Sequence, residues 1–459
     1  MDISTKMSIK EALHGAKKLH FVGIGGVSIS ALALLSLERG YTVSGSDRSP
    51  GVFSKKCEEK GIKVIYGHFA ESADDCDAII YTAAVPLSSP ELARGRERGI
   101  PLITRADFLG YIMEDYDKRF GISGTHGKTT TTSMLSHIFI SAGLNPTVAN
   151  GAVTEELGGS LGIGGNEYFV YEACEYKDSF LSFSPTTAVI TNIELDHTDY
   201  YPSLDSVIRS FAKSLEGASV AVINADDENA LLASRDFKGR LIKISLLDES
   251  ADYYAKDLHY ERGRGVYTLC KNGVALSQIS LSVIGAFNVY NSLCAAACAS
   301  ESGVSPCDIA SALSSFKPAK RRFEIKREKD GIIIADDYAH HPSEIAATLK
   351  GVKGIGAERI ICIFQPHTYT RTRDLFDSFV WALSAADIVI LAKIFPARET
   401  DTLGVSSEML AEKLDSALYF DSFEEIASYV SKIMRRGDIV LTMGAGDVYK
   451  VGEMLLDIT

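Results

Sequence analysis

The chain reads Gly-Thr-His-Gly-Lys-Thr-Thr-Thr over residues 124–131, between a short apolar run and an apolar helical pattern. Small residues in such a loop let backbone N–H groups turn toward an anion, and the positive end of the next helix points at the same place. Lys128 adds a mobile positive charge, and Thr129 offers a hydroxyl to Mg²⁺. We therefore predict a nucleotide-phosphate loop, in which Gly124 and Gly127 stand closer than in the usual G-x-x-x-x-G-K-[ST] pattern.

Strand and helix patterns alternate along most of the chain. Runs typical of strands lie at residues 19–22, 42–47, 63–66, 78–81, 168–171, 187–191, 220–224, 332–335, 360–364, 388–391 and 439–443. Such alternation predicts an α/β protein with doubly wound parallel sheets. Mixed polar and apolar stretches at 266–269 and 280–282 predict an antiparallel addition to the central sheet.

The length of 459 residues predicts roughly three domains, at about 150 residues each. We place a Rossmann-like domain at residues 1–115, a P-loop-type ATPase domain at 116–316 and a second Rossmann-like domain at 317–459. We expect hinges near residues 115 and 317.

Composition narrows the class of protein. Hydrophobic residues make up 46% and charged residues 23%, which is typical of a globular enzyme. The net charge of −13 disfavours non-specific binding to nucleic acid or membranes, so we expect neither nucleic-acid binding nor membrane insertion. The eight cysteines have no zinc-type spacing, and residues 1–6 show no signal-peptide pattern. We therefore expect a cytoplasmic protein with reduced thiols.

Residues 23–28, Gly-Ile-Gly-Gly-Val-Ser, are similar to the dinucleotide fingerprint G-x-G-x-x-G. Asp47 ends the next strand, where an acid that binds a ribose would lie. From these residues alone, a pyrophosphate site and a tight strand-to-helix turn are equally good interpretations.

Carboxylates and a histidine follow two strands of the central segment, at residues 172–175 and 192–197. Either group alone is typical of a solvated loop, but beside a phosphate loop the two together favour a Mg²⁺ site. Asn288 and Asn291 lie one helical turn apart and could contact an adenine or a ribose. Without other context, we favour helix capping by Asn288.

The third segment carries two short basic clusters, at residues 320–322 and 371–373. Charge alone favours phosphate binding and a solvated surface equally. Residues 336–342, Asp-Asp-Tyr-Ala-His-His-Pro, follow a strand and indicate a site, because ligands gather at the carboxyl ends of parallel strands. Elsewhere, we expect Cys294, Cys298 and Trp381 in the core.

In this order, the motifs resemble the Mur ligase family of peptidoglycan synthesis over essentially the whole chain. Residues 340–345, His-His-Pro-Ser-Glu-Ile, and 370–376, Thr-Arg-Thr-Arg-Asp-Leu-Phe, are similar to its alanine-adding member. The resemblance implies three α/β domains that bind a UDP-sugar, ATP and an amino acid, in that order. It also implies an ATP- and Mg²⁺-dependent ligase that joins L-alanine to the carboxylate of UDP-N-acetylmuramate through an acyl phosphate, as a monomer or weak homodimer.

By position, the resemblance implies four sets of site residues. The ATP set is Gly124, Thr125, His126, Gly127, Lys128, Thr129, Thr130, Asn288, Asn291 and Arg322. The UDP-sugar set is Gly25, Gly26, Ser46, Asp47, His68 and Thr82. The amino-acid set is Tyr338, His340 and Arg371. The Mg²⁺ set is Thr129, Glu172, Glu175 and His197, and Cys174 between the two glutamates leaves open which of them serves. The catalytic residues implied are Lys128, His197, His340 and Arg371.

Three other functions stay open at this point. A sibling ligase could add a different amino acid or a preformed tripeptide. A regulatory nucleotide-binding protein is a second alternative, because Cys174, Tyr176 and Lys177 interrupt the acidic string usual in the family. A dehydrogenase, suggested only by residues 23–28, is the weakest.

Overall fold

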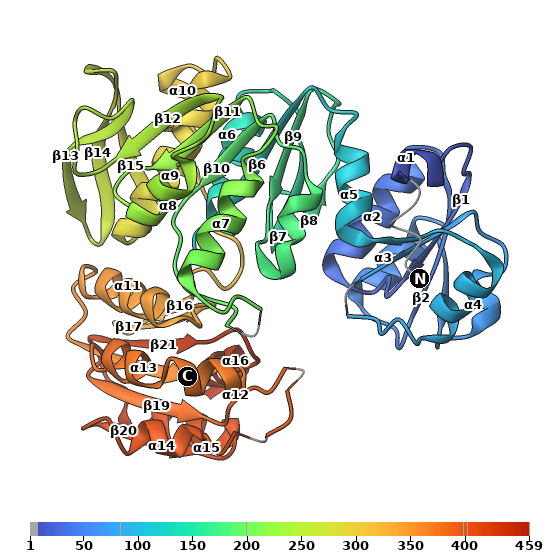
Figure 1. Ribbon diagram of the computed structural model, residues 1–459. Helices are drawn as coiled ribbons and strands as arrows, with labels where there is room; N and C mark the ends of the chain where they lie inside the picture. Colours follow the sequence, from blue (N-terminus) through green and yellow to red (C-terminus); the bar gives the residue numbers. More distant parts are fainter. Residues whose placement is uncertain (1–7, 83, 199, 398, 402, 459) are drawn as a thin grey trace. The chain divides into compact units, whose positions relative to one another are not determined.

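The computed structural model describes residues 8–458 except 83, 199, 398 and 402, so residues 1–6, considered above for a signal peptide, lie outside it (Figure 1). The chain forms two compact units. The first comprises Met1–Ser123, Leu144–Ala188 and Lys213–Val220, and the second comprises Gly124–Gly143, Val189–Ala212 and Ala221–Thr459. The division falls inside β10, α7 and β11.

The first unit contains a parallel five-stranded sheet with the strand order β3-β2-β1-β4-β5. Its central strand β1 is buried at four of five positions, as expected for a strand covered on both faces. The strands are β1 (Lys18–Val22), β2 (Thr42–Asp47), β3 (Lys63–Tyr66), β4 (Ala78–Tyr81) and β5 (Leu102–Thr104). The helices are α1 (Ile9–Ala12), α2 (Val27–Glu38), α3 (Val52–Glu59), η2 (Ala70–Ala73), α4 (Pro90–Arg98) and α5 (Arg105–Met113).

The same unit holds four further strands in the order β6-β9-β7-β8. β9 is parallel to both β6 and β7, and β8 pairs antiparallel with β7 at the edge. The elements are β6 (Lys118–Ser123), β7 (Thr147–Thr154), β8 (Gly159–Gly162), β9 (Tyr168–Glu172) and the 3₁₀ segment η3 (Tyr176–Ser182). β6 ends directly before the predicted phosphate loop.

In the second unit, six strands follow the order β15-β14-β13-β12-β11-β10. β13, β14 and β15 form antiparallel pairs, which confirms the predicted antiparallel addition. The strands are β10 (Thr187–Ile190), β11 (Val220–Asn224), β12 (Arg240–Ser245), β13 (Tyr253–Glu261), β14 (Arg264–Lys271) and β15 (Val274–Ile284). The helices are α6 (Lys128–Ser141), α7 (Leu204–Ser214), α8 (Glu228–Ser234), α9 (Ala286–Glu301) and α10 (Pro306–Ser315). α9 packs on α6, and Cys294 and Cys298 are buried in it as predicted.

The second unit also contains a six-stranded sheet, in which only the edge strand β16 is antiparallel. Helices α11, α13 and α14 contribute to one buried cluster, and α15 and α16 contribute to another. The strands are β16 (Glu324–Lys329), β17 (Ile332–Asp337), β18 (Arg359–Phe364), β19 (Ile388–Ala392), β20 (Ala417–Phe420) and β21 (Asp438–Met443). The helices are α11 (Pro342–Lys353), α12 (Tyr369–Asp374), α13 (Phe376–Leu383), α14 (Ser407–Ala411), α15 (Phe423–Ile433) and α16 (Tyr449–Ile458).

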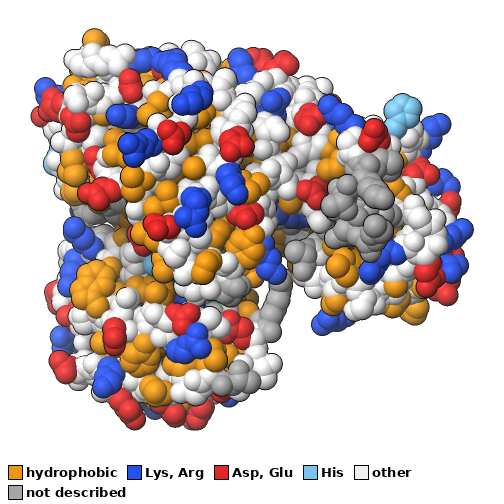
Figure 2. Space-filling model, viewed as in Figure 1, with side chains coloured by type: hydrophobic (Ala, Val, Ile, Leu, Met, Phe, Trp, Pro, Cys, Tyr) orange, Lys and Arg blue, Asp and Glu red, His pale blue; other side chains and the backbone are white. Residues whose placement is uncertain are grey.

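The prediction that Trp381 lies in the core is wrong. Its side chain is 66% exposed, because Phe379, Ala382 and Leu383 supply the buried stripe of α13 and the helical period turns Trp381 away from it. Across the face of the molecule in Figure 2, acidic and basic side chains are interspersed.

Candidate active site

Predicted UDP-sugar residues gather at the carboxyl edge of the five-stranded sheet. The backbone N–H of Gly25 donates to Asp47 Oδ2 at 2.8 Å, and a Cβ at Gly25 would lie 2.8 Å from the same oxygen. Gly23, with φ +84°, donates its N–H to the carbonyl of Ser46. Gly26 caps α2, whose positive end opens at this turn. The glycines are therefore required for a close backbone approach to the β2 end, where Asp47 stands.

The two remaining residues of that set follow β3 and β4. Thr82 lies beside the turn, because a Cβ on Gly23 would come within 2.9 Å of its Cγ2. His68 Nδ1 lies 2.9 Å from Glu91 Oε2, and the Glu91 side chain is fully buried. Glu91, which sequence reasoning missed, thus fixes the orientation of the His68 ring.

The phosphate loop is fastened to the segment that follows β10. Thr125 N–H donates to the carbonyl of Asn192, and Glu194 N–H donates to Thr125 Oγ1 at 2.8 Å. His126 N–H donates to Asn192 Oδ1, and its carbonyl accepts from Thr191 Oγ1 at 2.6 Å. These bonds fix the backbone of the loop against residues 191–194 at the N-terminus of α6.

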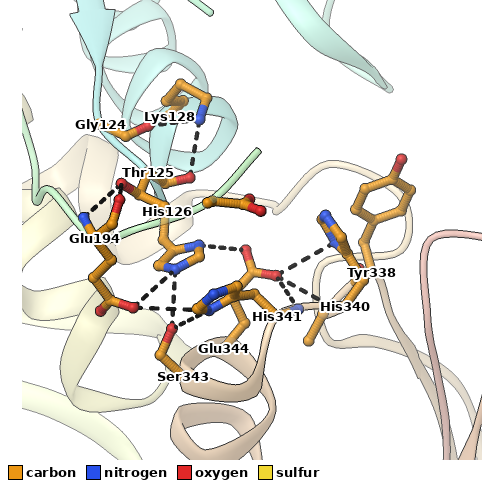
Figure 3. A network of polar contacts seen from close by, with 12 residues as sticks. Gly124, Thr125, His126, Lys128, Glu194, Tyr338, His340, His341, Ser343 and Glu344 are labelled. Carbon is orange, nitrogen blue, oxygen red and sulfur yellow. Dashed lines mark hydrogen bonds and ion pairs between the residues drawn. The ribbon is translucent and has the colours of Figure 1, made fainter. Parts of the chain in front are cut away.

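Lys128 is the first residue of α6, and its ammonium folds over the loop (Figure 3). Lys128 Nζ donates to the carbonyl oxygens of Gly124 at 2.5 Å and Thr125 at 2.9 Å. A cation held by loop carbonyls at a helix N-terminus has the charge and position to neutralise a phosphate placed there.

Gly127 caps α6 with φ +83°, and a Cβ there would collide with the amide of Asn291. Gly143 has a similar φ of +75°, but a Cβ there would meet nothing within 4 Å. We expect Gly143→Ala to cost about 1–2 kcal/mol of unfolding free energy from backbone strain alone. Gly127→Ala should cost more and should also weaken ATP binding, because Asn291 must move. Denaturant unfolding and ATP titration of the two variants check this; equal losses in both would contradict it.

A pocket of about 250 Å³ adjoins the loop in the second unit. Its walls combine small loop residues with amides, aromatic rings and groups from the six-stranded sheet: His126, Gly127, Thr130, Asn192, Asn224, Phe287, Asn288, Tyr290, Asn291, Arg322 and Asp337 among them. A lining that mixes polar groups with apolar and aromatic side chains suits a nucleotide, which has charged phosphates and a flat base.

The preference for Asn288 as a helix cap is wrong. Gly285 is the N-cap of α9, and Asn288 lies inside its first turn. Asn288 Nδ2 donates to the carbonyl of Ile284 at 2.7 Å, and its Oδ1 accepts from Asn291 Nδ2 at 3.0 Å. Both buried amides are therefore oriented by these bonds along the pocket wall.

Arg322 brings the third segment to the phosphate loop. Its Nη2 donates to Thr129 Oγ1 at 3.2 Å, and its guanidinium lies 5.0 Å from the centre of the Tyr338 ring. The sequence left two interpretations of this basic cluster open, phosphate binding and a solvated surface. Because Arg322 lines the pocket, its position favours phosphate binding.

The predicted amino-acid residues lie close to one another. The His340 ring lies 5.3 Å from that of Tyr338 and 5.9 Å from that of His367, and His367 Nδ1 lies 3.3 Å from Arg371 Nη1. Arg371 also donates to Asp196 Oδ1 through Nη2 at 2.9 Å. Both members of this ion pair are largely buried. Burial raises the pKa of Asp196, but the Arg371 charge outweighs it and holds that pKa well below its usual range.

His340 is neutral at physiological pH, because burial lowers its pKa to about 3. Its Nδ1 lies 3.0 Å from the carbonyl oxygen of Tyr338. A carbonyl only accepts, so Nδ1 carries the proton and Nε2 keeps a lone pair.

His126 joins the phosphate loop to the start of α11 (Figure 3). Its Nδ1 lies 3.1 Å from Glu344 Oε1, and its Nε2 lies 2.9 Å from Ser343 Oγ and 3.5 Å from Glu194 Oε2. Burial alone would lower the pKa of His126, but the two carboxylates raise it to about 9. Sequence reasoning included Ser343 and Glu344 in the motif at residues 340–345 but gave neither a role in the site, although a Glu two residues after His341-Pro342 is a recognisable helix-start signal.

Glu172 and Glu175, two of the four predicted Mg²⁺ ligands, belong to the first unit, and Thr129 and His197 belong to the second. Glu172 ends β9 and accepts from Gly151 N–H at 3.1 Å, and Glu175 is buried. Their assignment as a metal shell stays a prediction.

Three family models match the chain in succession. "Mur ligase family, catalytic domain" matches residues 18–117, "Mur ligase middle domain" matches 122–299 and "Mur ligase, glutamate ligase domain" matches 321–446. The chain belongs to the Mur ligase family.

Curated relatives and a solved structure agree with this membership. The Mur ligases of Clostridium novyi (strain NT) and Acetivibrio thermocellus named UDP-N-acetylmuramate–L-alanine ligase are 43% and 44% identical over 448 residues. Each alignment covers 96% of this chain. The first covers 97% of the Clostridium novyi protein, and the second covers 96% of the Acetivibrio thermocellus protein. The crystal structure of UDP-N-acetylmuramate–alanine ligase MurC from Thermotoga maritima superposes with a TM-score of 0.80 at 29% identity, covering 96% of this chain and 98% of that one.

A Mur ligase of another kind is also similar. A murein peptide ligase from Psychrobacter arcticus has a TM-score of 0.68 and 25% identity, over 96% of this chain and 98% of that one. The predicted α/β class with three Mur ligase domains is confirmed. Within the described residues, no helix has the length and apolar character needed to cross a bilayer.

Proposed function

We propose that this chain is an ATP-dependent ligase that joins L-alanine to the carboxylate of UDP-N-acetylmuramate, a step in making peptidoglycan precursors. One observation carries the proposal beyond family membership: Arg322, which precedes the six-stranded sheet, donates to Thr129 of the phosphate loop and lines the adjoining pocket of about 250 Å³. This contact supports a phosphoryl donor bound between the phosphate loop and the segment proposed to receive the acceptor amino acid.

The first chemical problem is activation of a carboxylate. Hydroxide is a poor leaving group, so the muramyl carboxylate first attacks the γ-phosphorus of ATP. The bond from this phosphorus to the β–γ bridging oxygen breaks, ADP leaves, and the carboxylate becomes an acyl phosphate. Lys128 and the N-terminus of α6 stabilise the charge on the phosphoryl oxygens, and Arg322, which donates to Thr129 Oγ1, adds a second positive charge there.

Mg²⁺ supplies further charge neutralisation on the phosphates when it is bound. The Thr129 hydroxyl at the first turn of α6 and the carboxylates of Glu172 and Glu175 are oxygen donors of the kind Mg²⁺ prefers, and His197 is the proposed nitrogen ligand. Glu172 ends β9 and Glu175 follows it by three residues, and both are proposed as ligands.

The second problem is attack by the amine of L-alanine, which must be neutral. The neutral amine adds to the acyl carbon, the C–O bond to the phosphoryl group breaks, and inorganic phosphate leaves as the amide forms. His340 Nε2, with its lone pair, accepts a hydrogen bond from the amine and receives its proton. Because burial lowers the pKa of His340, the imidazole passes this proton on to the departing phosphate. Arg371 offers a charge for the alanine carboxylate. Exclusion of water protects the acyl phosphate, which fits domains that close about hinges near residues 115 and 317.

The proposed substrate roles divide the chain as expected from its motifs. Residues 1–115 bind the UDP-sugar through the Gly25–Asp47 turn, residues 116–316 bind ATP and residues 317–459 receive the amino acid. All eight cysteines are free thiols, which suits a reducing compartment such as the cytoplasm.

An acceptor assay tests this function. The purified chain with ATP, Mg²⁺ and UDP-N-acetylmuramate should release ADP and phosphate only when L-alanine is added. Glycine, L-serine and a murein tripeptide are the other acceptors, and we expect L-alanine to give the highest kcat/KM. Preference for the tripeptide would assign the chain to the murein peptide ligases, and ATP binding without product would favour a regulatory protein.

A further inference from the structure

A cluster of metal-binding side chains lies beside the phosphate loop, apart from the Mg²⁺ ligands proposed above. His126, Glu194 and His341 each offer one donor atom, and the three atoms lie within 4.8 Å of one another. They come from the phosphate loop, the segment after β10 and the N-cap of α11 (Figure 3). All three belong to the second unit.

The spacing of the donors suits a tetrahedral ion. Glu194 Oε2 lies 3.5 Å from His126 Nε2 and 3.7 Å from His341 Nδ1. Zinc bonds of about 2.0–2.1 Å place neighbouring tetrahedral ligands roughly 3.4 Å apart. Ser343 Oγ lies 2.9 Å from His126 Nε2 and 2.7 Å from His341 Nδ1, so its hydroxyl bridges the two nitrogens by hydrogen bonds that a bound ion would replace.

The surroundings provide the support that metal-bound histidines need. The second nitrogen of His126, Nδ1, lies 3.1 Å from Glu344 Oε1. A carboxylate in that place fixes the ring and its tautomer, as it does behind many zinc-bound histidines. The backbone N–H of His341 also lies 3.3 Å from Glu344 Oε2, so the same carboxylate orders both histidine segments.

The chemistry of the donors favours a dication at this point. Glu194 offers a carboxylate oxygen beside two imidazoles, and a second carboxylate, that of Glu344, lies behind the His126 ring. Mixed imidazole and carboxylate donors of this kind are typical of sites for divalent transition metals.

We propose that His126, Glu194 and His341 form a binding site for a transition-metal dication of the Zn²⁺ type, distinct from the Mg²⁺ that accompanies ATP. Two imidazole nitrogens select against Mg²⁺, which prefers six oxygen ligands. Because His126 belongs to the phosphate loop and His341 begins α11, a bound ion would fasten the loop to that helix.

Co²⁺ is the spectroscopic probe for this site. Titration of the full chain, without nucleotide and with excess Mg²⁺, should give one equivalent of the visible d–d absorption typical of tetrahedral Co²⁺. No thiolate charge-transfer band should accompany it, because no cysteine belongs to the donor set. One equivalent of Zn²⁺ should abolish the absorption.

Two ligand variants and one control assign the absorption. His341→Ala and the isosteric Glu194→Gln should each weaken Co²⁺ binding on the order of 100-fold or more. His259→Ala removes a half-exposed histidine from β13 and should leave binding unchanged. The proposal would be overturned if the wild type showed no tetrahedral Co²⁺ absorption, or if both ligand variants bound Co²⁺ as tightly as the wild type with the same absorption. Because binding is measured without substrates, neither result depends on the ligase activity.

Discussion

Lys128→Ala should lower the turnover of ATP by about 100-fold to 1,000-fold, the size of effect seen when one preorganised charge-stabilising donor is removed from an active site. Lys128 Nζ donates hydrogen bonds to the carbonyl oxygens of Gly124 and Thr125, which hold its charge at the N-terminus of α6, where the phosphates are proposed to bind. No backbone N–H can replace a full positive charge as the γ-phosphoryl group moves to the carboxylate. L-alanine-dependent release of phosphate at saturating substrates measures the loss.

Lys450→Ala is the matched control. Lys450 lies on α16, is 47% exposed and pairs with Asp447, which precedes the helix, so its removal should leave turnover within a factor of about two. Lys128→Arg keeps the charge but replaces a compact ammonium with a planar fork, and it should recover only part of the activity. Full activity in Lys128→Ala, with the fold intact by circular dichroism, would remove the phosphate-loop assignment.

The parts of this site that sequence could predict are local. A strand, a glycine turn and a helix lie within a dozen residues at both Gly25 and Gly127, so their geometry follows from backbone rules. The bond from Gly25 to Asp47 crosses only to the neighbouring strand, and the rule that ligands gather at strand carboxyl ends anticipates it.

The parts that sequence could not predict are long-range contacts. Ser343 meets His126 across 217 residues, and Arg371 meets Asp196 across 175. No periodicity in the sequence reports which loops come together. Glu344 shows the difficulty: its position predicts a helix start, and it does accept from the His341 N–H, yet the same carboxylate also holds the His126 ring. A spacing rule for helix starts reports only the first of these two roles.

Errors in the fold have the same origin. Trp381 looks like a core residue by composition, but only the phase of α13 decides which side of the helix is buried. Edge strands such as β8 and β16 are short or polar and lack the apolar run that identified the buried strands.

Arg371→Met should destabilise the protein and impair the use of L-alanine together. Arg371 and Asp196 are 12% and 10% exposed, so removal of the guanidinium leaves a carboxylate buried without its partner. Loss of one member of such a pair costs about 3 kcal/mol of unfolding free energy. Loss of a charged hydrogen bond to the acceptor should lower kcat/KM for L-alanine roughly 10-fold to 100-fold. Denaturant unfolding and the acceptor assay measure the two effects.

A second substitution separates these effects. In Arg371→Met/Asp196→Asn no charge is left uncompensated, and Asn keeps an oxygen to accept from the His197 N–H, so most of the lost stability should return. Activity with L-alanine should not return, because the guanidinium is still absent. Arg373→Met, two residues along at a side chain 50% exposed, should change stability by less than about 1 kcal/mol. If the double variant regains both stability and activity, Arg371 only stabilises the fold, and another positively charged residue must bind the carboxylate of L-alanine.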